Sequence, residues 1–164
     1  MAFTYAQLKT ALQDYTQNSE TSFVTNLPVF IRSSEERILK TVQLTLFRKN
    51  SAGNMTQNDE YLSMPTDYLA PFSLSYTDSD NDKHFLDFKS VNFIQDFNPD
   101  STTTGGPRYY ANFDVENFII GPTPNDNFVV ELHYYYRPTS LTAGAEGDTT
   151  WLSTNAELTL LYGA

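Results

Sequence analysis

The sequence of 164 residues contains no cysteine, which excludes both disulfide bridges and thiolate metal sites. Positive charge is scarce, since 10 Lys and Arg residues oppose 20 Asp and Glu residues and give a formal net charge of −10. A chain with this charge repels a phosphate backbone, so wrapping of nucleic acid and docking on an anionic membrane are not expected. A DNA duplex could still move through a wide acidic channel without sticking.

Long apolar runs are also missing, because no segment approaches the ~18 residues that a membrane-spanning helix needs. The opening MAFTYAQLK lacks the charged and apolar regions of a secretory signal, so the default compartment is the cytoplasm. Aromatic residues are plentiful at 15%, which favours a strand-rich component. A chain of this length can form one ordinary domain, or a small domain with an inserted lobe.

Helical patterns occupy the first 42 residues. Thr4 and Gln7 have the spacing of a capping box, and Phe3 precedes the cap. The apolar face of this first helix is expected to contain Leu8, Ala11, Leu12 and Tyr15. A second helix is predicted from Pro28 to Thr41, because proline suits a first helical turn. Its buried side is expected to contain Phe30, Ile31, Ser34, Ile38 and Val42, and its solvent side Arg32, Glu36 and Lys40.

Strand-like runs separated by turns rich in Asn, Asp, Gly and Pro extend from Gln43 to about Arg137. The predicted strands are Thr45–Lys49, Glu60–Met64, Phe72–Thr77, Lys83–Phe88, Arg108–Phe113, Asn117–Ile120 and Phe128–Arg137. Short strands with frequent turns indicate a sandwich or a small twisted antiparallel sheet. One short helix is predicted at Ser90–Phe97, with Ser90 as its cap and Phe93 and Phe97 on one face.

Two hairpins are expected in this region. One joins Asn117–Ile120 to Phe128–Arg137 through the turn-forming residues 121–127, and the other joins Phe72–Thr77 to Lys83–Phe88 through Asp78–Asp82. Alternate residues of the last strand define a core face that consists of Phe128, Val130, Leu132, Tyr134 and Tyr136. The opposite face of this strand is amphipathic, as expected for a partly solvated sheet.

A polar linker is predicted at Thr139–Thr150, followed by a C-terminal helix capped by Ser153 or Asn155. Leu158, Leu161 and Tyr162 are spaced to share one face of that helix. The sequence therefore predicts an α+β fold with three segments. Residues 1–42 form an N-terminal helical segment, residues 43–138 an inserted antiparallel β-rich lobe, and residues 139–164 a linker and a C-terminal helix that packs on the N-terminal helices into one helical body.

None of the polar constellations predicts catalysis, a cofactor or a metal. Asp78–Asp82 begins like a calcium loop, but Lys83 and Lys89 occupy the positions that need Gly and a bidentate Glu. His84 and His133 lie in different strands without regular carboxylate partners, which is typical of histidines at a partly solvated surface. The acid pairs Glu35-Glu36 and Asp114/Glu116 do not face each other across a cleft as glycoside hydrolysis requires. The loop at 104–107 lacks the Lys and helix of a phosphate-binding loop, and no serine has a nucleophile-elbow context.

Tyrosines are the most suggestive candidates for a contact surface. In Tyr134-Tyr135-Tyr136 the middle residue should point away from its neighbours, and Tyr109 should likewise point away from Tyr110. Tyrosine is enriched at interfaces because it joins a large apolar ring to a polar tip. It is equally common at the edge of a core, so the pattern fits either an interface or ordinary packing.

Several segments, read in order, resemble a known family of proteins. They are FTYAQLKTALQDYTQN, FIRSSEERILKTVQLTLFRKN, YLSMPTDYLAPFSL, GGPRYYANFD, NFIIGPTPNDNFVVELHYYYRP and TTWLSTNAELTLLYGA. Together they resemble the head-to-tail adaptor, or connector, proteins of tailed bacteriophages. The similarity spans nearly the whole chain and rests on the order of the segments, of which FIRSSEERI and GPTP…ELHYYYRP are the most distinctive.

The resemblance implies a non-catalytic virion protein, made in the host cytoplasm, that forms a ring of usually twelve copies between the portal and the next tail component, a nozzle or a tail tube. Helices would face the portal, the β-rich lobe would face the tail, and DNA would pass through the central channel during ejection without sequence-specific binding. Interface candidates are Arg32, Arg37, Lys40, Tyr109, Tyr135, Arg137, Leu158, Leu161 and Tyr162. Such proteins carry a longer helical C-terminus after LLYG, so portal contacts by that segment are expected only if the chain is truncated here or its tail is disordered.

One alternative comes from a different class of proteins. Exposed tyrosines on a sandwich-like middle region would also suit a carbohydrate-binding β module of a phage tail. Loss of glycan binding in Tyr135→Ala would favour that function. An enzyme would require a carboxylate pair in a concave site.

Overall fold

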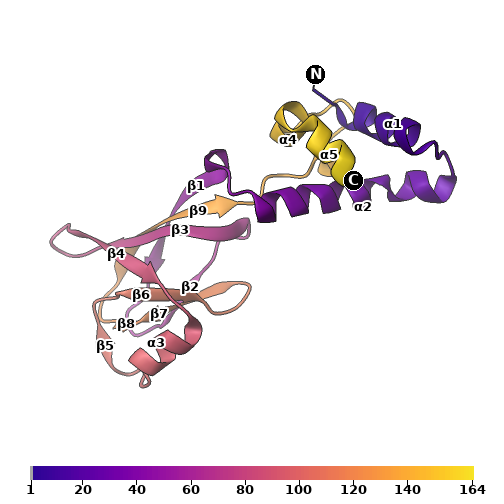
Figure 1. Ribbon diagram of the computed structural model, residues 1–164. Helices are drawn as coiled ribbons and strands as arrows, with labels where there is room; N and C mark the ends of the chain where they lie inside the picture. The colour runs from indigo at the N-terminus through magenta and orange to yellow at the C-terminus, as the bar shows by residue number, and fades with distance from the viewer. Residues whose placement is uncertain (1) are drawn as a thin grey trace. The chain divides into compact units, whose positions relative to one another are not determined.

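The computed structural model describes residues 2–164 (Figure 1). Contacts between residues divide the chain into two compact units. The helical unit comprises the chain up to Leu44 together with Pro138–Ala164, and the β unit comprises Thr45–Arg137. The β unit is therefore continuous in sequence, whereas both ends of the chain meet in the helical unit.

The helical unit begins with α1, Tyr5–Thr16, whose start matches the predicted capping box. The Thr4 hydroxyl accepts the Gln7 N–H at 3.2 Å, and the Gln7 side chain accepts the Thr4 N–H at 3.0 Å. These two bonds satisfy donors that every helix leaves free at its N-terminus. The remaining elements of this unit are α2 (Thr21–Thr41), the 3₁₀ turn η2 (Leu141–Ala143), α4 (Trp151–Asn155) and α5 (Glu157–Gly163).

Helix α2 begins seven residues before Pro28, so the predicted start at that proline is wrong. Proline removes one N–H from the interior of the helix, a cost that packing of the preceding turns must offset. Leu27 is fully buried in the helical core, and Thr25 and Asn26 donate side-chain hydrogen bonds to carbonyls four residues back. These contacts hold the first two turns of α2 in helical geometry.

The core of the helical unit combines side chains from both ends of the chain. Its buried members are Tyr5, Leu8, Leu12, Leu27, Ile31, Leu141 and Leu160. Three details differ from the predicted helix faces. Phe30 and Val42 are exposed while Leu27 and Leu39 are buried, Tyr15 is exposed on α1, and α5 buries Leu160 rather than Leu158 or Tyr162. The C-terminal segment also forms two short helices, with Thr150 rather than Ser153 or Asn155 as the first cap.

The β unit contains the 3₁₀ turn η1 (Thr45–Phe47), helix α3 (Val91–Phe97) and nine strands. The strands are β1 (Arg48–Met55), β2 (Tyr61–Ser63), β3 (Tyr68–Thr77), β4 (Lys83–Phe88), β5 (Thr104–Gly105), β6 (Tyr109–Asn112), β7 (Asn117–Gly121), β8 (Thr123–Pro124) and β9 (Phe128–Tyr136). Seven of them form one mixed sheet in the order β1-β9-β3-β4-β6-β7-β2, and β5 pairs with β8. The fold class is α+β, as predicted.

Two predictions about the strands need correction. The lobe is not purely antiparallel, because β4 pairs with β6 and β5 with β8 in parallel. The predicted hairpin across residues 121–127 does not form, since β9 pairs with β1 and β3 while β7 pairs with β2 and β6. The β3–β4 hairpin is confirmed, with Leu74 opposite Leu86 and Thr77 opposite Lys83.

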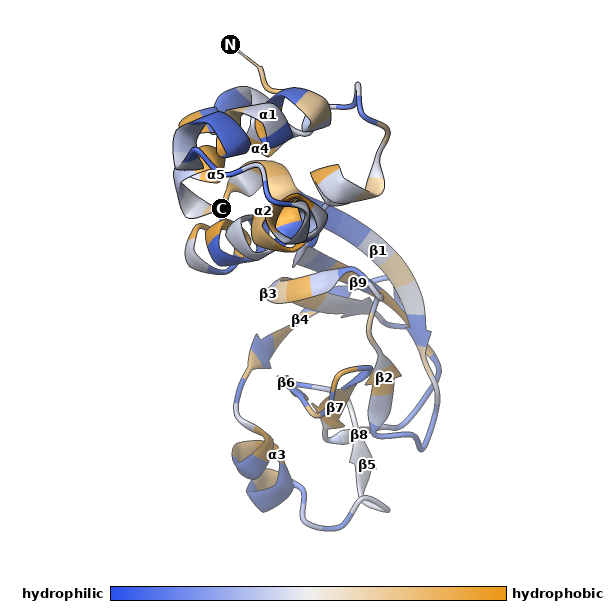
Figure 2. Cartoon of the chain, turned by 90° about the vertical axis from the view of Figure 1, so that its right-hand side faces the viewer, coloured by the Kyte–Doolittle hydropathy of each residue, from blue (hydrophilic) through white to orange (hydrophobic). Residues whose placement is uncertain are grey.

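The long sheet curls into a nearly closed barrel around one core. Strands β1, β2, β3, β4, β6, β7 and β9 all contribute buried side chains to it. The alternation predicted for β9 is confirmed, since Phe128, Val130, Leu132 and Tyr134 are buried in this core. By contrast β1 has few hydrophobic residues, and Met55 at its end is the buried one (Figure 2).

Helix α3 is capped by Ser90, whose hydroxyl accepts the Phe93 N–H as predicted. It packs on β6 and β7 through Ile94, which is buried with Ala111 and Ile119. A Cβ on Gly121 would lie 2.8 Å from Cγ2 of Ile94. Glycine at the end of β7 therefore permits the close approach of the helix to the sheet.

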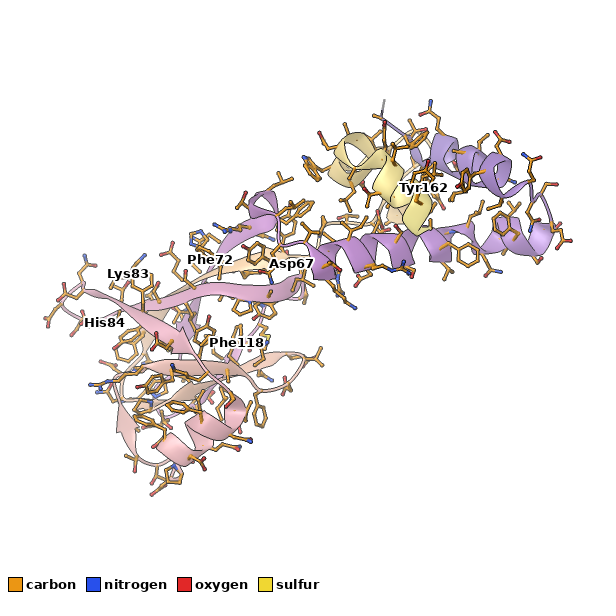
Figure 3. The ribbon with its side chains drawn as sticks, in the orientation of Figure 1. Asp67, Phe72, Lys83, His84, Phe118 and Tyr162 are labelled. Carbon is orange, nitrogen blue, oxygen red and sulfur yellow. The ribbon has the colours of Figure 1, made fainter. Side chains whose placement is uncertain are left out.

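A buried phenol anchors the end of β9. Tyr134 donates a hydrogen bond of 2.7 Å to Asp67, which also accepts one of 2.8 Å from the Lys49 ammonium (Figure 3). Partial desolvation acts to raise the pKa of Asp67, but the hydrogen bonds from Lys49 and Tyr134 outweigh it and hold that pKa below its ordinary value. Desolvation and the bond to Asp67 raise the pKa of Tyr134.

We expect Tyr134→Phe to lower the free energy of unfolding by about 1 kcal/mol at neutral pH, because one hydrogen bond to a carboxylate is lost. The pKa of Asp67 is depressed in the folded state, so its contribution is present above the unfolded pKa and disappears as pH falls through the folded pKa. Urea denaturation at several pH values should therefore show the difference between the two proteins shrinking in acid. A difference that stays constant down to the lowest pH would contradict the assignment.

Candidate interaction surfaces

The acidic turn that begins like a calcium loop is held by local hydrogen bonds. The Asp78 carboxylate accepts the N–H groups of Asp80 and Asp82 and lies 2.7 Å from Nε2 of His84. The contact with His84 and those with the backbone lower the pKa of Asp78. Asp78 thus shapes the turn of the β3–β4 hairpin. Within residues 2–164 no group of three or more His, Asp or Glu side chains is arranged to hold a metal ion.

The first candidate surface lies on α2 and carries the predicted basic residues. Arg32, Arg37 and Lys40 are all exposed. Arg32 lies 3.5 Å from the Thr142 hydroxyl, and the Lys40 ammonium lies 3.5 Å from the Glu36 carboxylate one turn earlier. An exposed pair of this kind contributes little to stability. The charges of this face are therefore available for contacts with other molecules.

The second surface joins α1 to α5 in the helical unit. The rings of Tyr15 and Tyr162 meet edge to face with centroids 5.6 Å apart, although both side chains are about two-thirds exposed. Leu158 is exposed one turn before Tyr162, and Leu161 is partly buried against the helical core. Tyr162 can be followed in Figure 3. Tyr15, Leu158 and Tyr162 thus form one solvent-facing patch of large side chains, and such patches are common at contact surfaces.

The third surface lies on the outer face of β1, β9 and β3. The Arg48 guanidinium lies 4.0 Å from the centre of the exposed Phe72 ring and donates hydrogen bonds to the Tyr135 hydroxyl at 3.0 and 3.2 Å. Tyr135 itself is buried, at 7% exposure, so it does not present the ring that the sequence suggested. Tyr135 therefore does not support the carbohydrate-binding alternative, because a glycan needs an accessible aromatic ring to stack on.

A fourth surface covers α3 and the start of β6. The rings of Phe93 and Phe97 stack at an interplanar angle of 9°, and both meet Tyr109 edge to face. The Lys89 ammonium lies 5.8 Å from the ring centres of both Phe93 and Tyr109. Tyr109 is only partly exposed, and the two phenylalanines form the outer part of this cluster.

A pocket of about 570 Å³ opens beside the first half of β4. Its lining residues come from β3, β4, the loop that leads into β6 and the first residue of β6. They are Tyr76, Lys83, His84, Phe85, Asp87, Gly106, Pro107, Arg108 and Tyr109. The Tyr76 side chain is buried, so its phenol lies at the floor of the pocket. Burial raises the pKa of this phenol. The hydroxyl oxygen of Tyr76 would lie 3.1 Å from a Cβ on Gly106, so a side chain there would crowd the floor.

The structure distributes the predicted interface residues over both units. Arg32, Arg37, Lys40, Leu158, Leu161 and Tyr162 belong to the helical unit, and Tyr109, Tyr135 and Arg137 to the β unit. Sequence reasoning missed Tyr15, Phe72 and the pocket beside β4. Tyr15 was assigned to a buried face, and the pocket depends on the parallel pairing of β4 with β6, for which no local signal exists.

A scan against models of protein families matches the SU10 adaptor protein model over residues 3–164. The chain belongs to the SU10 adaptor protein family. This match confirms the resemblance to phage head-to-tail adaptors. The adaptor family is structural rather than catalytic, and its members are virion components that associate with other phage head and tail components.

A search of curated proteins finds no match. Among residues 2–164, none of the helices combines the length and the apolar character that crossing a bilayer requires.

Proposed function

We propose that this adaptor is a subunit of a homo-oligomeric ring, usually of twelve copies, that joins the portal to the next tail component, a nozzle or a tail tube. The observation that carries the proposal is the family match over residues 3–164. A ring subunit between two different neighbours needs separate contact surfaces, and the exposed patches on the two units supply candidates for them. Function then depends on association, with no catalytic step and no cofactor.

In this proposal the helical unit is the body that faces the portal, and the β unit reaches toward the tail. The basic face of α2 and the patch formed by Tyr15, Leu158 and Tyr162 are the proposed contacts of the helical unit. Tyr109 and Arg137 are the proposed contacts of the β unit. The ring sits at the head–tail junction of a virion whose proteins are made in the host cytoplasm.

The net negative charge of the chain suits the surface of a channel through which DNA moves. With 20 acidic and 10 basic residues, the channel surface of such a ring repels the phosphate backbone rather than binding it. Repulsion lowers the friction on a duplex that must leave rapidly during ejection. The adaptor would accordingly contribute to the DNA channel without reading sequence.

We expect Arg37→Glu to weaken assembly by at least about tenfold, because reversal of a charge at a complementary contact costs more than 1.4 kcal/mol. Arg37→Gln, which removes the charge without reversing it, should have a smaller effect. Sedimentation velocity over a concentration series measures both, and circular dichroism confirms that the variants are folded. Unchanged assembly of Arg37→Glu would remove α2 from the proposed contacts.

The proposed function is tested by the solution mass of the adaptor alone and after mixing with the portal protein of the same phage. Size exclusion with light scattering should show a stoichiometric ring on the portal. A monomer that joins only in the presence of the portal would mean that the portal templates the ring. An adaptor that ignores the portal at every concentration would overturn the proposal.

A further inference from the structure

The mixed sheet has an opening along one side of β4. On one side, β4 pairs with β3 from Lys83 to Leu86. On the other side, it pairs with β6 only at Asp87 and Phe88. The Asp87 N–H donates to the Arg108 carbonyl and the Lys89 N–H to the Tyr110 carbonyl. Because backbone groups alternate in direction along a strand, the N–H and C=O groups of Phe85 and Lys83 face the same way, into the opening.

This opening is the pocket of about 570 Å³ described above, a size typical of binding sites. It occupies the place that a further strand beside Lys83–Leu86 would take. The ring of Phe85 is 68% exposed at its wall, which leaves a large apolar surface in water. An unpaired strand edge next to an exposed aromatic ring is the arrangement to which extended peptides add as an extra strand.

The charges of the pocket select the kind of segment that fits. Lys83 is paired with Glu131 and His84 with Asp78, and the Asp87 carboxylate lies 3.9 Å from the Lys89 ammonium. Lys83 and His84 are labelled in Figure 3. Arg108 is exposed, and no ion pair of its guanidinium is found among residues 2–164. An incoming carboxylate would form a charge-assisted, potentially bidentate hydrogen bond with this guanidinium.

We propose that the open edge of β4 receives an extended, carboxylate-bearing segment of a second copy of the adaptor, which adds a strand beside Lys83–Leu86 and places an acid on Arg108. A second copy is favoured by charge, because acidic residues outnumber basic residues twofold in this chain. The inference rests on the proposed ring, in which each copy receives a segment from one neighbour and gives one to the other, as heterologous contacts do.

Photo-crosslinking tests this docking directly. The full-length adaptor carries p-benzoyl-phenylalanine in place of Phe85, and isotope-labelled and unlabelled copies are mixed with the portal protein at high concentration before irradiation. Crosslinked peptides of mixed label, containing Asp or Glu, are expected, and their yield should fall at least about tenfold in Arg108→Glu because a charge-assisted bond is lost. Crosslinks confined to single chains, or insensitive to Arg108→Glu, would overturn the inference.

A second measurement addresses the backbone edge. Phe85→Pro removes the N–H that faces the opening, whereas Phe85→Ala keeps it and serves as the matched control. Ring assembly in the presence of the portal protein, measured by sedimentation, should be at least about tenfold weaker for Phe85→Pro than for Phe85→Ala, with equal circular dichroism. Equal association of the two variants would exclude strand addition.

The ring on the portal and the docking at β4 can be tested independently of each other. An adaptor that joins the portal but gives no crosslinks of mixed label at position 85 would leave the proposed ring in place and remove the β4 docking. An adaptor that crosslinks to a second copy but ignores the portal would keep the docking and overturn the ring on the portal. Crosslinking to the portal protein at this position would also exclude a second copy as the occupant.

Discussion

Replacement of Phe118 by alanine is expected to lower the free energy of unfolding of the β unit by about 3–5 kcal/mol, the range for a large aromatic side chain lost from a packed core. Phe118 lies on β7 and is completely buried (Figure 3). Its ring meets the rings of Tyr68 and Tyr110 edge to face, at centroid distances of 5.2 and 5.6 Å. Burial raises the pKa of Tyr110 to about 12, so this neighbour remains an uncharged phenol at neutral pH.

The size of this effect follows from the position of Phe118 inside the nearly closed barrel. Atoms removed from Phe118 leave a cavity that neighbouring strands cannot fill, because hydrogen bonds hold β7 to β2 on one side and to β6 on the other. Urea denaturation with hydrogen exchange at strand amides measures the loss. Val115→Ala is the matched control, since Val115 is 94% exposed in the preceding turn and its loss should cost less than about 0.5 kcal/mol. If Phe118→Ala lowers the free energy of unfolding by less than about 1.5 kcal/mol, the neighbouring strands have moved to fill the cavity.

Replacement of Glu35 by alanine is expected to destabilise the helical unit by about 2–4 kcal/mol, since buried donors lose their acceptor. Glu35 on α2 is 4% exposed, and its carboxylate accepts the Leu141 N–H at 3.0 Å and the Ser140 hydroxyl. The Ser140 hydroxyl also contacts the Thr142 hydroxyl at 2.9 Å and keeps a partner in the variant. The Leu141 N–H loses its acceptor in the variant. Water does not replace that acceptor, because Leu141 is only 1% exposed.

Glu35 thereby ties η2, which follows the β unit in sequence, to a helix that precedes it. Glu35→Gln keeps an acceptor oxygen and should cost roughly half as much as Glu35→Ala. Lys40→Ala is the control on the solvent side of the same helix, where loss of an exposed ion pair should cost no more than about 0.5 kcal/mol. Thermal and urea denaturation compare the four proteins. Equal stabilities of Glu35→Ala and Lys40→Ala would show that the buried carboxylate does not hold η2.

Sequence reasoning located most elements but placed several of their faces wrongly. Leu158, Leu161 and Tyr162 have helical spacing, yet Leu160 is the residue of α5 in the core. A helix of seven residues offers apolar side chains in several directions, so its buried side depends on the helices beside it. The same limit explains Tyr135, which β9 directs outward but which Arg48 and Phe72 cover from the neighbouring strands.

The candidate surfaces were accessible to sequence reasoning only in part. The exposure of Arg32, Arg37 and Lys40 follows from the polar side of one helix. The patch formed by Tyr15, Leu158 and Tyr162 combines helices from the two ends of the chain, which no local pattern brings together. The pocket beside β4 likewise exists because β6 pairs in parallel with the last two residues of that strand alone.

By itself, the sequence determined the features that depend on residues close together in the chain. These are the capping box of Thr4, the cap at Ser90, the β3–β4 turn and the core face of β9, as well as the family to which the order of its segments points. Only the tertiary structure decided which strands pair. The polar segment Arg48–Met55 forms a strand that pairs with β9, and β7 pairs with β2 and β6 instead of β9. Distant strands pair in the arrangement that buries one shared core. The free energy of this burial depends on all the strands of the unit together, so no single segment predicts it.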